Sequence, residues 1–128
     1  MLNYIKGMDI SSLDEIEKLG AKFYDNGEEK DLLTILKSYG TNYIRLRIWN
    51  DPKSPEGEPY GAGNTDYHTM LRMAKRVKAA ELGFLLDFHY SDFWADPGKQ
   101  RKPKAWEHFT VEQLEQAVYE FTKETMEH

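Results

Sequence analysis

Three short apolar segments of the sequence each carry charged residues at alternate positions. These residues are Asp9 in the first segment, Arg45 and Arg47 in the second, and Asp87 with His89 in the third. Because alternate residues of a strand point to the same face of a sheet, each segment places its charged groups together on one face. Carboxylates, guanidinium groups and an imidazole arranged in this way can pair with one another or bind a polar substrate.

His89 has two interpretations. A single histidine is most often an ordinary hydrogen-bonded residue, but its place at the end of a strand segment, beside Tyr90 and Asp92, favours a substrate-binding role for His89 and Asp92. The spacing Asp87-x-His89-x-x-Asp92 also offers donor groups suitable for a metal ion. No second histidine or remote carboxylate accompanies this group, so we expect no metal and no other cofactor.

Two tryptophans, Trp94 and Trp106, lie in a long polar stretch without helical periodicity. Sugar rings present C–H groups that stack on aromatic faces, so exposed tryptophans of this kind indicate a sugar-binding platform. The alternative is that both side chains pin the loop to the body of the protein. Trp49 ends the second segment on its charged face, where a core role and a substrate-binding role are equally open.

The same stretch contains a basic cluster made of Lys99, Arg101, Lys102 and Lys104. Such a cluster can bind phosphate where a glycine-rich turn joins a strand to a helix. No turn of that kind accompanies these residues. We therefore interpret the cluster as part of a solvated loop.

The elements that must position these residues alternate between strand and helix. Strands are predicted at residues 4–10, 42–49 and 84–89. Apolar stripes at helical spacing predict helices at 28–39 and 66–80. Two capping boxes of the type Ser/Thr-x-x-Glu/Gln predict where two further helices start. Ser12 with Glu15 begins a short helix that ends near Gly20, and Thr110 with Gln113 begins the last helix.

The order βαβαβα predicts right-handed crossover units, a parallel sheet and therefore an α/β fold. Parallel strands covered by helices on both faces are normally apolar throughout. Arg45 and Arg47 would face covering helices in an open, doubly wound sheet, and unpaired charges there are costly. The charged face instead favours the interior of a TIM (β/α)8 barrel near its carboxyl ends, with the chain forming the first three of eight units.

Length and composition set further limits. The chain has 128 residues, no cysteine, 17 basic and 22 acidic residues, and a net charge of -5. This size predicts a single domain over residues 1–128, and the acidic balance argues against nucleic-acid binding. No segment approaches the roughly 20 apolar residues of a membrane span. The N-terminus resembles no signal peptide, which indicates a cytoplasmic protein only if Met1 is the native start; otherwise the compartment stays open.

Two longer motifs indicate a family. The segment Asn42-Tyr-Ile-Arg-Leu-Arg-Ile-Trp-Asn-Asp-Pro52 and the near-continuous run from Leu85 to Gln100 resemble glycoside hydrolase family 53, the arabinogalactan endo-β-1,4-galactanases. Three shorter segments, Gly7–Ser12, Tyr60–Gly63 and Lys102–Trp106, resemble that family in the same order. One departure is Glu81-Leu82, which precedes Gly83 where the family has glycine directly after Lys-Ala-Ala.

The resemblance implies a retaining endo-glycosidase in which two glutamates act as acid/base and nucleophile. The acid/base follows an asparagine at the end of the fourth strand of such barrels, and the nucleophile ends the seventh. This sequence contains neither, so it is expected to be an incomplete TIM-barrel catalytic domain that is inactive alone. An inward arginine on the second strand supports the nucleophile in related barrels. The resemblance implies this role for Arg45 first and for Arg47 second.

The resemblance also implies galactan or arabinogalactan as the substrate, and extracellular proteins are common in the family. The substrate would contact residues on the charged face and its adjoining loop, namely Asp9, Trp49, Asp87, His89, Asp92, Trp94 and Trp106. Two alternatives stay open. In the first, the chain is a non-catalytic carbohydrate-binding fragment that keeps Trp94, Trp106 and His89. In the second, it is a half-barrel that needs a complementing chain and self-associates through its open edges.

Overall fold

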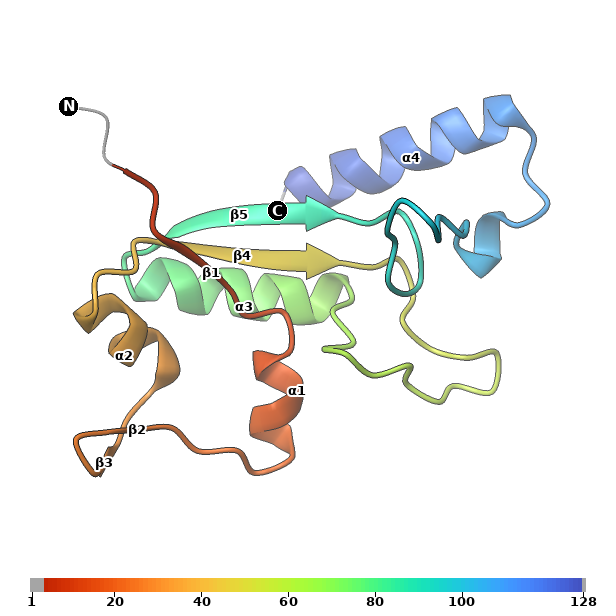
Figure 1. Cartoon of the computed structure of the whole chain (residues 1–128). Coiled ribbons are helices and arrows are strands. Elements are labelled where there is room, and N and C mark those ends of the chain that lie inside the picture. The colour runs from red at the N-terminus through yellow and green to blue at the C-terminus, as the bar shows by residue number, and fades with distance from the viewer. Residues whose placement is uncertain (1–3, 128) are drawn as a thin grey trace.

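A computed structural model describes residues 4–127, so Met1, on which the expectation about the compartment depends, lies outside the described residues. Its centre is a parallel sheet of three strands, β1 (Gly7–Asp9), β4 (Tyr43–Ile48) and β5 (Gly83–Phe88), in the order β1-β4-β5 (Figure 1). The parallel α/β arrangement is confirmed. The first strand is shorter than predicted, because pairing with β4 begins only at Gly7.

The two faces of β4 differ as the alternation predicts. Ile44, Leu46 and Ile48 are fully buried on one face, whereas the Arg45 side chain is half exposed on the other. The strand register sets Asp9 beside Arg45, and Arg47 beside Asp87. The charged groups therefore gather on one face, toward the carboxyl ends of the three strands.

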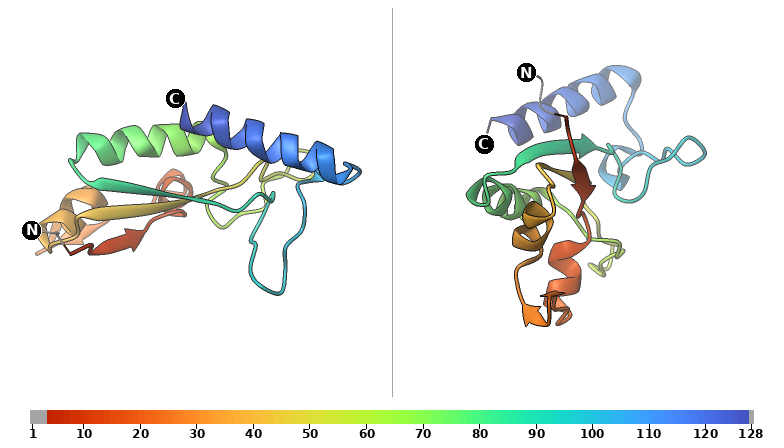
Figure 2. Two further views of the ribbon diagram at one scale, coloured as in Figure 1. Left: turned by 90° about the horizontal axis from the view of Figure 1, so that it is seen from above. Right: turned by 60° about the vertical axis from the view of Figure 1, so that its left-hand side comes forward.

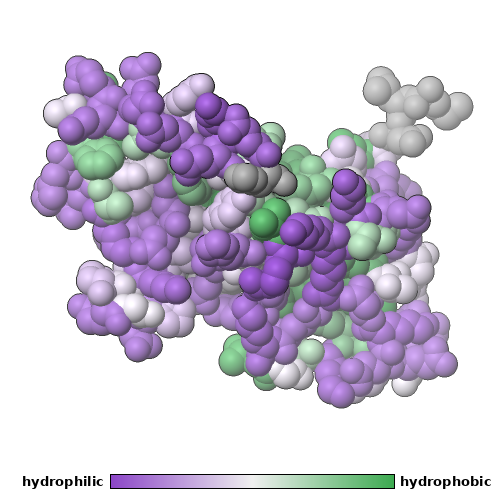
Figure 3. All heavy atoms as spheres, turned by 180° about the vertical axis from the view of Figure 1, so that it is seen from behind, coloured by the Kyte–Doolittle hydropathy of each residue, from purple (hydrophilic) through white to green (hydrophobic). Residues whose placement is uncertain are grey.

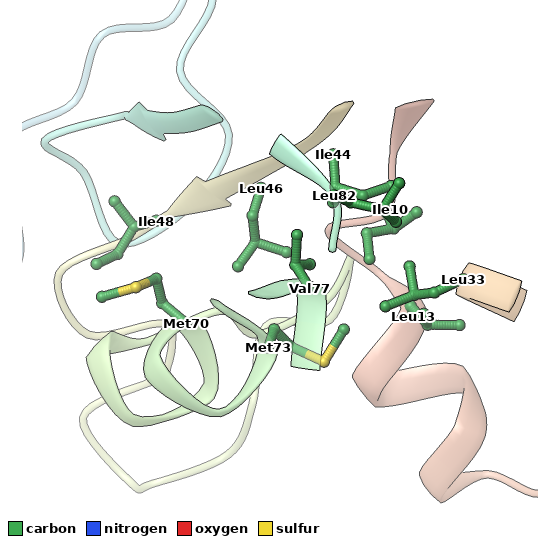
Figure 4. Packing of buried hydrophobic residues seen from close by; sticks show 10 residues of the cluster. All are labelled: Ile10, Leu13, Leu33, Ile44, Leu46, Ile48, Met70, Met73, Val77 and Leu82. Carbon is green, nitrogen blue, oxygen red and sulfur yellow. The ribbon is translucent and has the colours of Figure 1, made fainter. Parts of the chain in front are cut away.

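Helices cover the apolar face. They are α1 (Leu13–Lys18), α2 (Leu32–Ser38), α3 (Tyr67–Ala79) and α4 (Val111–Met126), and Figure 2 shows α3 and α4 along one side of the sheet. In Figure 4 the side chains of β4 point toward Met70, Met73 and Val77 of α3. Full burial of one such aliphatic side chain contributes about 1.5–3 kcal/mol, so this layer holds the strands in place.

Side-chain caps begin α3 and α4, and the cap of α4 is the predicted one. The Asp66 carboxylate accepts a hydrogen bond from the Thr69 backbone N–H and begins α3. Thr110 and Gln113 form both hydrogen bonds of the capping box that begins α4. Each cap satisfies backbone N–H groups that lack a partner within the helix, which fixes where these two helices start.

The capping box predicted for Ser12 and Glu15 is wrong. Ser12 precedes α1, but its side chain makes no capping hydrogen bond. The Glu15 carboxylate instead accepts hydrogen bonds from the Gly63 backbone N–H at 2.6 Å and from Asn64 Nδ2 at 2.7 Å. Glu15 therefore anchors the loop of residues 51–64 to α1.

The helix predicted at 28–39 is also corrected, because α2 begins at Leu32 with Asp31 as its cap. Residues Glu28–Glu29 form β3, which pairs antiparallel with β2 (Tyr24–Asp25). Asn26 and Gly27 both have positive φ, as a two-residue hairpin turn requires. The Asn-Gly pair was the available signal for this hairpin, which the apolar stripe of the following helix obscured.

Two loops extend from the carboxyl ends of the strands. The first, residues 51–64, follows β4, and the second, residues 90–108, follows β5 and includes the short 3₁₀ helix η1 (Lys104–Trp106). Hydrophilic residues cover most of the face seen in Figure 3, with small hydrophobic areas between them. No helix in the described part of the chain is long and apolar enough to cross a membrane.

Candidate active site

Ser11 joins the ends of β1 and β4. Its hydroxyl donates to Asp9 Oδ1 at 2.6 Å and accepts from the Arg47 backbone N–H at 2.9 Å and from Arg47 Nε at 3.0 Å. Arg47 Nη2 lies 3.4 Å from Asp9 Oδ1. Ser11 is buried, so these bonds hold the Asp9 carboxylate and the Arg47 guanidinium in fixed positions. The spacing Asp9-x-Ser11 is typical of an Asx turn, a signal that the sequence offered for this residue.

Arg45 links the two outer strands. Its Nη2 donates a short hydrogen bond to Asp87 Oδ2, and its Nη1 lies 3.7 Å from Asp9 Oδ2. The predicted pairing of the inward arginines with Asp9 and Asp87 is therefore confirmed. The Arg45 side chain is 49% exposed, whereas that of Arg47 is 12% exposed. Arg45 is therefore the more accessible of the two arginines.

The Asp9 carboxylate is held in its ionised form. Burial raises the pKa of Asp9, but hydrogen bonds from Ser11 and the charges of Arg47 and Arg45 outweigh it, so the net pKa lies below the ordinary value. An ionised Asp9 in turn keeps both guanidinium groups oriented. This carboxylate therefore serves to position the arginines and is unsuited to act as a proton donor near neutral pH.

Trp49 and His89 form the inner wall of the site. Trp49 Nε1 donates to His89 Nδ1 at 3.1 Å, and the Ala95 backbone N–H donates to the same nitrogen at 3.2 Å. Since Nδ1 accepts two hydrogen bonds, the proton of the ring lies on Nε2, which donates to Asp87 Oδ2 at 3.2 Å. His89 and Arg45 therefore both donate to Asp87 Oδ2 and together orient this carboxylate.

The substrate-binding role for Trp49 is wrong. Its side chain is fully buried against the rings of His89, Phe93 and Trp94. A sugar cannot reach a ring that solvent cannot reach, so the alternative core role is the one observed. Trp49 acts on the site through its hydrogen bond to His89 and its packing against Trp94.

Trp94 is the exposed aromatic of the site, with 46% of its surface accessible. Arg47 Cζ lies 3.9 Å from the centre of the Trp94 ring, so the guanidinium covers one face of the indole. This cation–π contact holds the ring in place, and nearly half of the side chain stays accessible. The geometry agrees with the predicted sugar platform, which itself stays a prediction.

Asp92 is placed differently from its expected substrate-binding role, whereas the role of Trp106 stays a prediction. Trp106 is half-buried and packs edge-on against Phe121 of α4, so it pins the loop to the body of the protein. Asp92 is buried, and its carboxylate accepts from the backbone N–H groups of Asp51 and Lys104. Both residues fix the path of the loop after β5.

Lys104 completes this anchor. Its Nζ lies 2.8 Å from an Asp51 carboxylate oxygen and 3.2 Å from Asp92 Oδ2. Burial lowers the pKa of Lys104, but hydrogen bonds and charges of Asp51 and Asp92 outweigh it and raise the net pKa. The ammonium group therefore stays charged and ties the loop after β4 to the loop after β5.

Two hollows adjoin Trp94. The smaller, of about 620 Å³, includes Arg45, Asp87 and His89 in its lining, and the larger, of about 830 Å³, includes Tyr60 and Phe93. Trp94 lines both. Tyr60 and Phe93, which are exposed and in edge-on contact, are site residues that sequence reasoning missed. No group of three or more potential metal ligands occurs within residues 4–127.

Comparisons with known proteins agree with this architecture. Residues 5–128 match the model of glycosyl hydrolase family 53. A catalytic domain of that family from Ignisphaera aggregans shares 50% sequence identity and a TM-score of 0.96, over 99% of this chain and 36% of that one. A structure of fungal β-1,4-galactanases shares 35% identity with a TM-score of 0.82, over 94% of this chain and 34% of that one.

Named relatives have the same relation. The endo-β-1,4-galactanase of Bacillus subtilis is 45% identical over 98% of this chain and 29% of its own length. The arabinogalactan endo-β-1,4-galactanase of Cellvibrio japonicus is 36% identical over 94% of this chain and 30% of its own length. The chain therefore spans about a third of these relatives.

The parallel sheet with helices on one face and a charged opposite face is thus the first part of a TIM-barrel catalytic domain. The chain belongs to glycosyl hydrolase family 53.

Proposed function

We propose that this chain forms the substrate-binding and nucleophile-supporting part of an endo-β-1,4-galactanase that cleaves galactan or arabinogalactan with retention. The observation that carries the proposal is the exposed face of Trp94, which borders the hollow containing Arg45, Asp87 and His89. The names of the Bacillus and Cellvibrio relatives support galactan as the substrate. A retaining mechanism needs two carboxyl groups about 5–5.5 Å apart. We assign both to glutamates in the two thirds of the family fold that the chain does not span.

Within this proposal Arg45 supports the nucleophile. Asp87 and Asp9 orient its guanidinium, and half of its side chain stays accessible. A guanidinium beside a carboxylate stabilises the ionised form that attacks the sugar. Arg47 has a different role, because its contacts with Ser11, Asp9 and Trp94 make it a support for the ring of Trp94.

The open sheet supports a second candidate, a half-barrel that is completed by another chain. In the described residues β1 and β5 each pair with β4 alone, and Leu85, which lies beside Arg45 on the uncovered face, is about half exposed. Unpaired strand edges favour pairing with other chains. Light scattering after size-exclusion chromatography tests this candidate. We expect oligomers of the 128-residue chain, and a sharp monomer peak with cooperative unfolding contradicts it.

The experiment that tests the binding function compares two epimeric ligands. The chain is titrated with β-1,4-galactotetraose and with β-1,4-glucotetraose by calorimetry, with Trp94→Ala and Trp106→Ala as paired variants. We expect saturable binding of the galactan oligosaccharide that is lost in Trp94→Ala and kept in Trp106→Ala. Absence of galactotetraose binding, or equal binding by both variants, contradicts the proposal.

A further inference from the structure

The larger hollow has a lining unlike that of a site for a neutral sugar alone. Tyr60, Phe93 and Trp94 supply three exposed aromatic side chains. Four cationic side chains also line it, and these are Lys99, Arg101, Lys102 and Lys104. The sequence alone favoured a solvated loop for this cluster. The structure instead gathers it around a concave surface next to the sugar platform.

The cations differ in whether they already have a carboxylate partner. Lys104 pairs with Asp51 and Asp92, so its charge is neutralised. Lys99 and Arg101 make no side-chain ion pair within residues 4–127, and Lys102 Nζ donates to the Glu107 backbone carbonyl at 2.7 Å. These three charges remain available to an anionic ligand.

The acidic side chains that line the larger hollow do not fully neutralise the charges of Lys99, Arg101 and Lys102. Asp92 is used by Lys104, and one Asp96 oxygen accepts from the Gly98 backbone N–H at 2.7 Å. Asp96 and the exposed Glu107 are then the carboxylates that face the three available cations. The hollow therefore keeps an excess of positive charge on a chain whose net charge is -5.

The larger hollow also shares part of its lining with the smaller hollow, the proposed galactan site. Trp94, Asp96, Arg101 and Lys102 line both hollows. Because Trp94 lines both hollows together with Arg101 and Lys102, a saccharide chain stacked on Trp94 would share this lining with two cationic side chains. Charge-assisted hydrogen bonds from guanidinium and ammonium groups to a sugar carboxylate would then fix the adjoining unit.

We propose that the larger hollow binds a carboxylate-bearing sugar, a uronate unit, next to the neutral galactan on Trp94. This inference rests on the proposed function, since the galactan places the uronate. The site would favour acidic galactans, in which neutral galactose and uronate residues occur in one polymer. The aromatic side chains would pack against the sugar ring, and Lys99, Arg101 and Lys102 would bind its carboxylate.

Calorimetric titrations with trigalacturonate and with β-1,4-galactotriose test the inference. We expect trigalacturonate binding that weakens as salt rises and falls about tenfold in Lys99→Gln/Arg101→Gln, the order expected for two exposed ion pairs. Galactotriose binding should stay unchanged in the single variant Lys99→Gln, because Lys99 lines the larger hollow but not the smaller one. Lys75→Gln/Lys78→Gln, which removes the same charge from exposed positions of α3, should change neither titration.

Each result separates the two proposals. Galactotriose binding with no trigalacturonate binding, or equal trigalacturonate affinity in the parent and both double variants, overturns the uronate site and leaves the galactan site standing. Displacement of trigalacturonate by an equal concentration of inorganic phosphate also overturns it, because the cluster would then bind anions without selecting a sugar. Trigalacturonate binding without galactotriose binding supports the uronate site and counts against the galactan site.

Discussion

Trp49 Nε1 donates a hydrogen bond to His89 Nδ1 at 3.1 Å, and this contact between neighbouring strand ends determines which ring nitrogen of His89 faces Asp87. The buried indole thereby acts on a carboxylate that it does not touch. The Ala95 backbone N–H reinforces the same tautomer from the loop after β5.

Trp49→Phe keeps an aromatic ring but removes the indole N–H. We expect a loss of about 1–2 kcal/mol in the free energy of unfolding, from one hydrogen bond and a small loss of packing. Urea denaturation measures the loss, and the ¹⁵N chemical shifts of His89 report its tautomer. Unchanged stability together with an unchanged tautomer would show that Ala95 alone orients the imidazole.

Gly63 lies where the loop after β4 crosses the start of α1. A Cβ at this position would lie 2.2 Å from the Ser11 carbonyl oxygen, and its φ of +109° already disfavours other residues. We expect Gly63→Ala to cost about 2–4 kcal/mol in the free energy of unfolding. Gly57→Ala is the control, because Gly57 has φ +91° with nothing within 4 Å of the added carbon. Equal losses in the two variants would place the whole effect in the backbone conformation and none in the contact with Ser11.

Asp9 makes stability depend on pH. Its pKa in the folded protein is below the ordinary value of 3.8, so the unfolded chain binds more protons in this range. The contribution of Asp9 is therefore complete above 3.8 and is lost as the pH falls through the lower folded value. Asp14 and Asp31 also have lowered pKa values and act in the same direction.

The difference between the parent and Asp9→Asn isolates Asp9 from those carboxylates. Chemical denaturation between about pH 6 and about pH 2 should show the parent more stable at the upper end, with the gap closing as the pH falls. A gap that stays constant over this range would mean that Asp9 stabilises the fold without its charge.

The sequence predicted the features that follow from periodicity. The period of two in Ile44, Leu46 and Ile48 indicated which face would be buried, and the same period aligned Arg45 with Arg47 on the other face. The parallel sheet and the start of α4 followed equally well from strand order and a capping box. Such features depend on neighbours close in sequence or on one repeated geometry.

The misplaced residues are those whose environment depends on the path of a loop. Trp49 and Asp92 were expected at the substrate, yet both are held in buried positions by contacts that the loop after β5 creates. No local pattern encodes whether a tryptophan in a polar loop turns inward or outward. The capping role predicted for Glu15 is wrong for a similar reason, because its hydrogen-bond partner Gly63 lies 48 residues away in the sequence.

Substitution of Arg45 and substitution of Arg47 should change stability by different amounts, because we assign catalytic support to Arg45 and structural support to Arg47. We expect Arg45→Ala to cost less than about 1 kcal/mol of stability, because its pairs are exposed to solvent. Arg47→Ala should cost about 2–3 kcal/mol, because it breaks the part-buried hydrogen bond from Arg47 Nε to Ser11, the contact with Asp9 and the support of Trp94. Thermal or urea unfolding of the two variants measures this order, and the reverse order would contradict the assignment.

The central claim is tested most directly by galactan cleavage in a chimaera, in which this chain replaces the matching segment of the Bacillus subtilis relative. We expect the folded chimaera to cleave β-1,4-galactan with retention of anomeric configuration, which NMR spectra of the products report. Its Arg45→Ala variant should turn over galactan about 100-fold more slowly at an unchanged melting temperature. A chimaera that folds cooperatively and leaves galactan uncut, or whose Arg45→Ala variant turns over galactan as fast as the parent, would contradict the account.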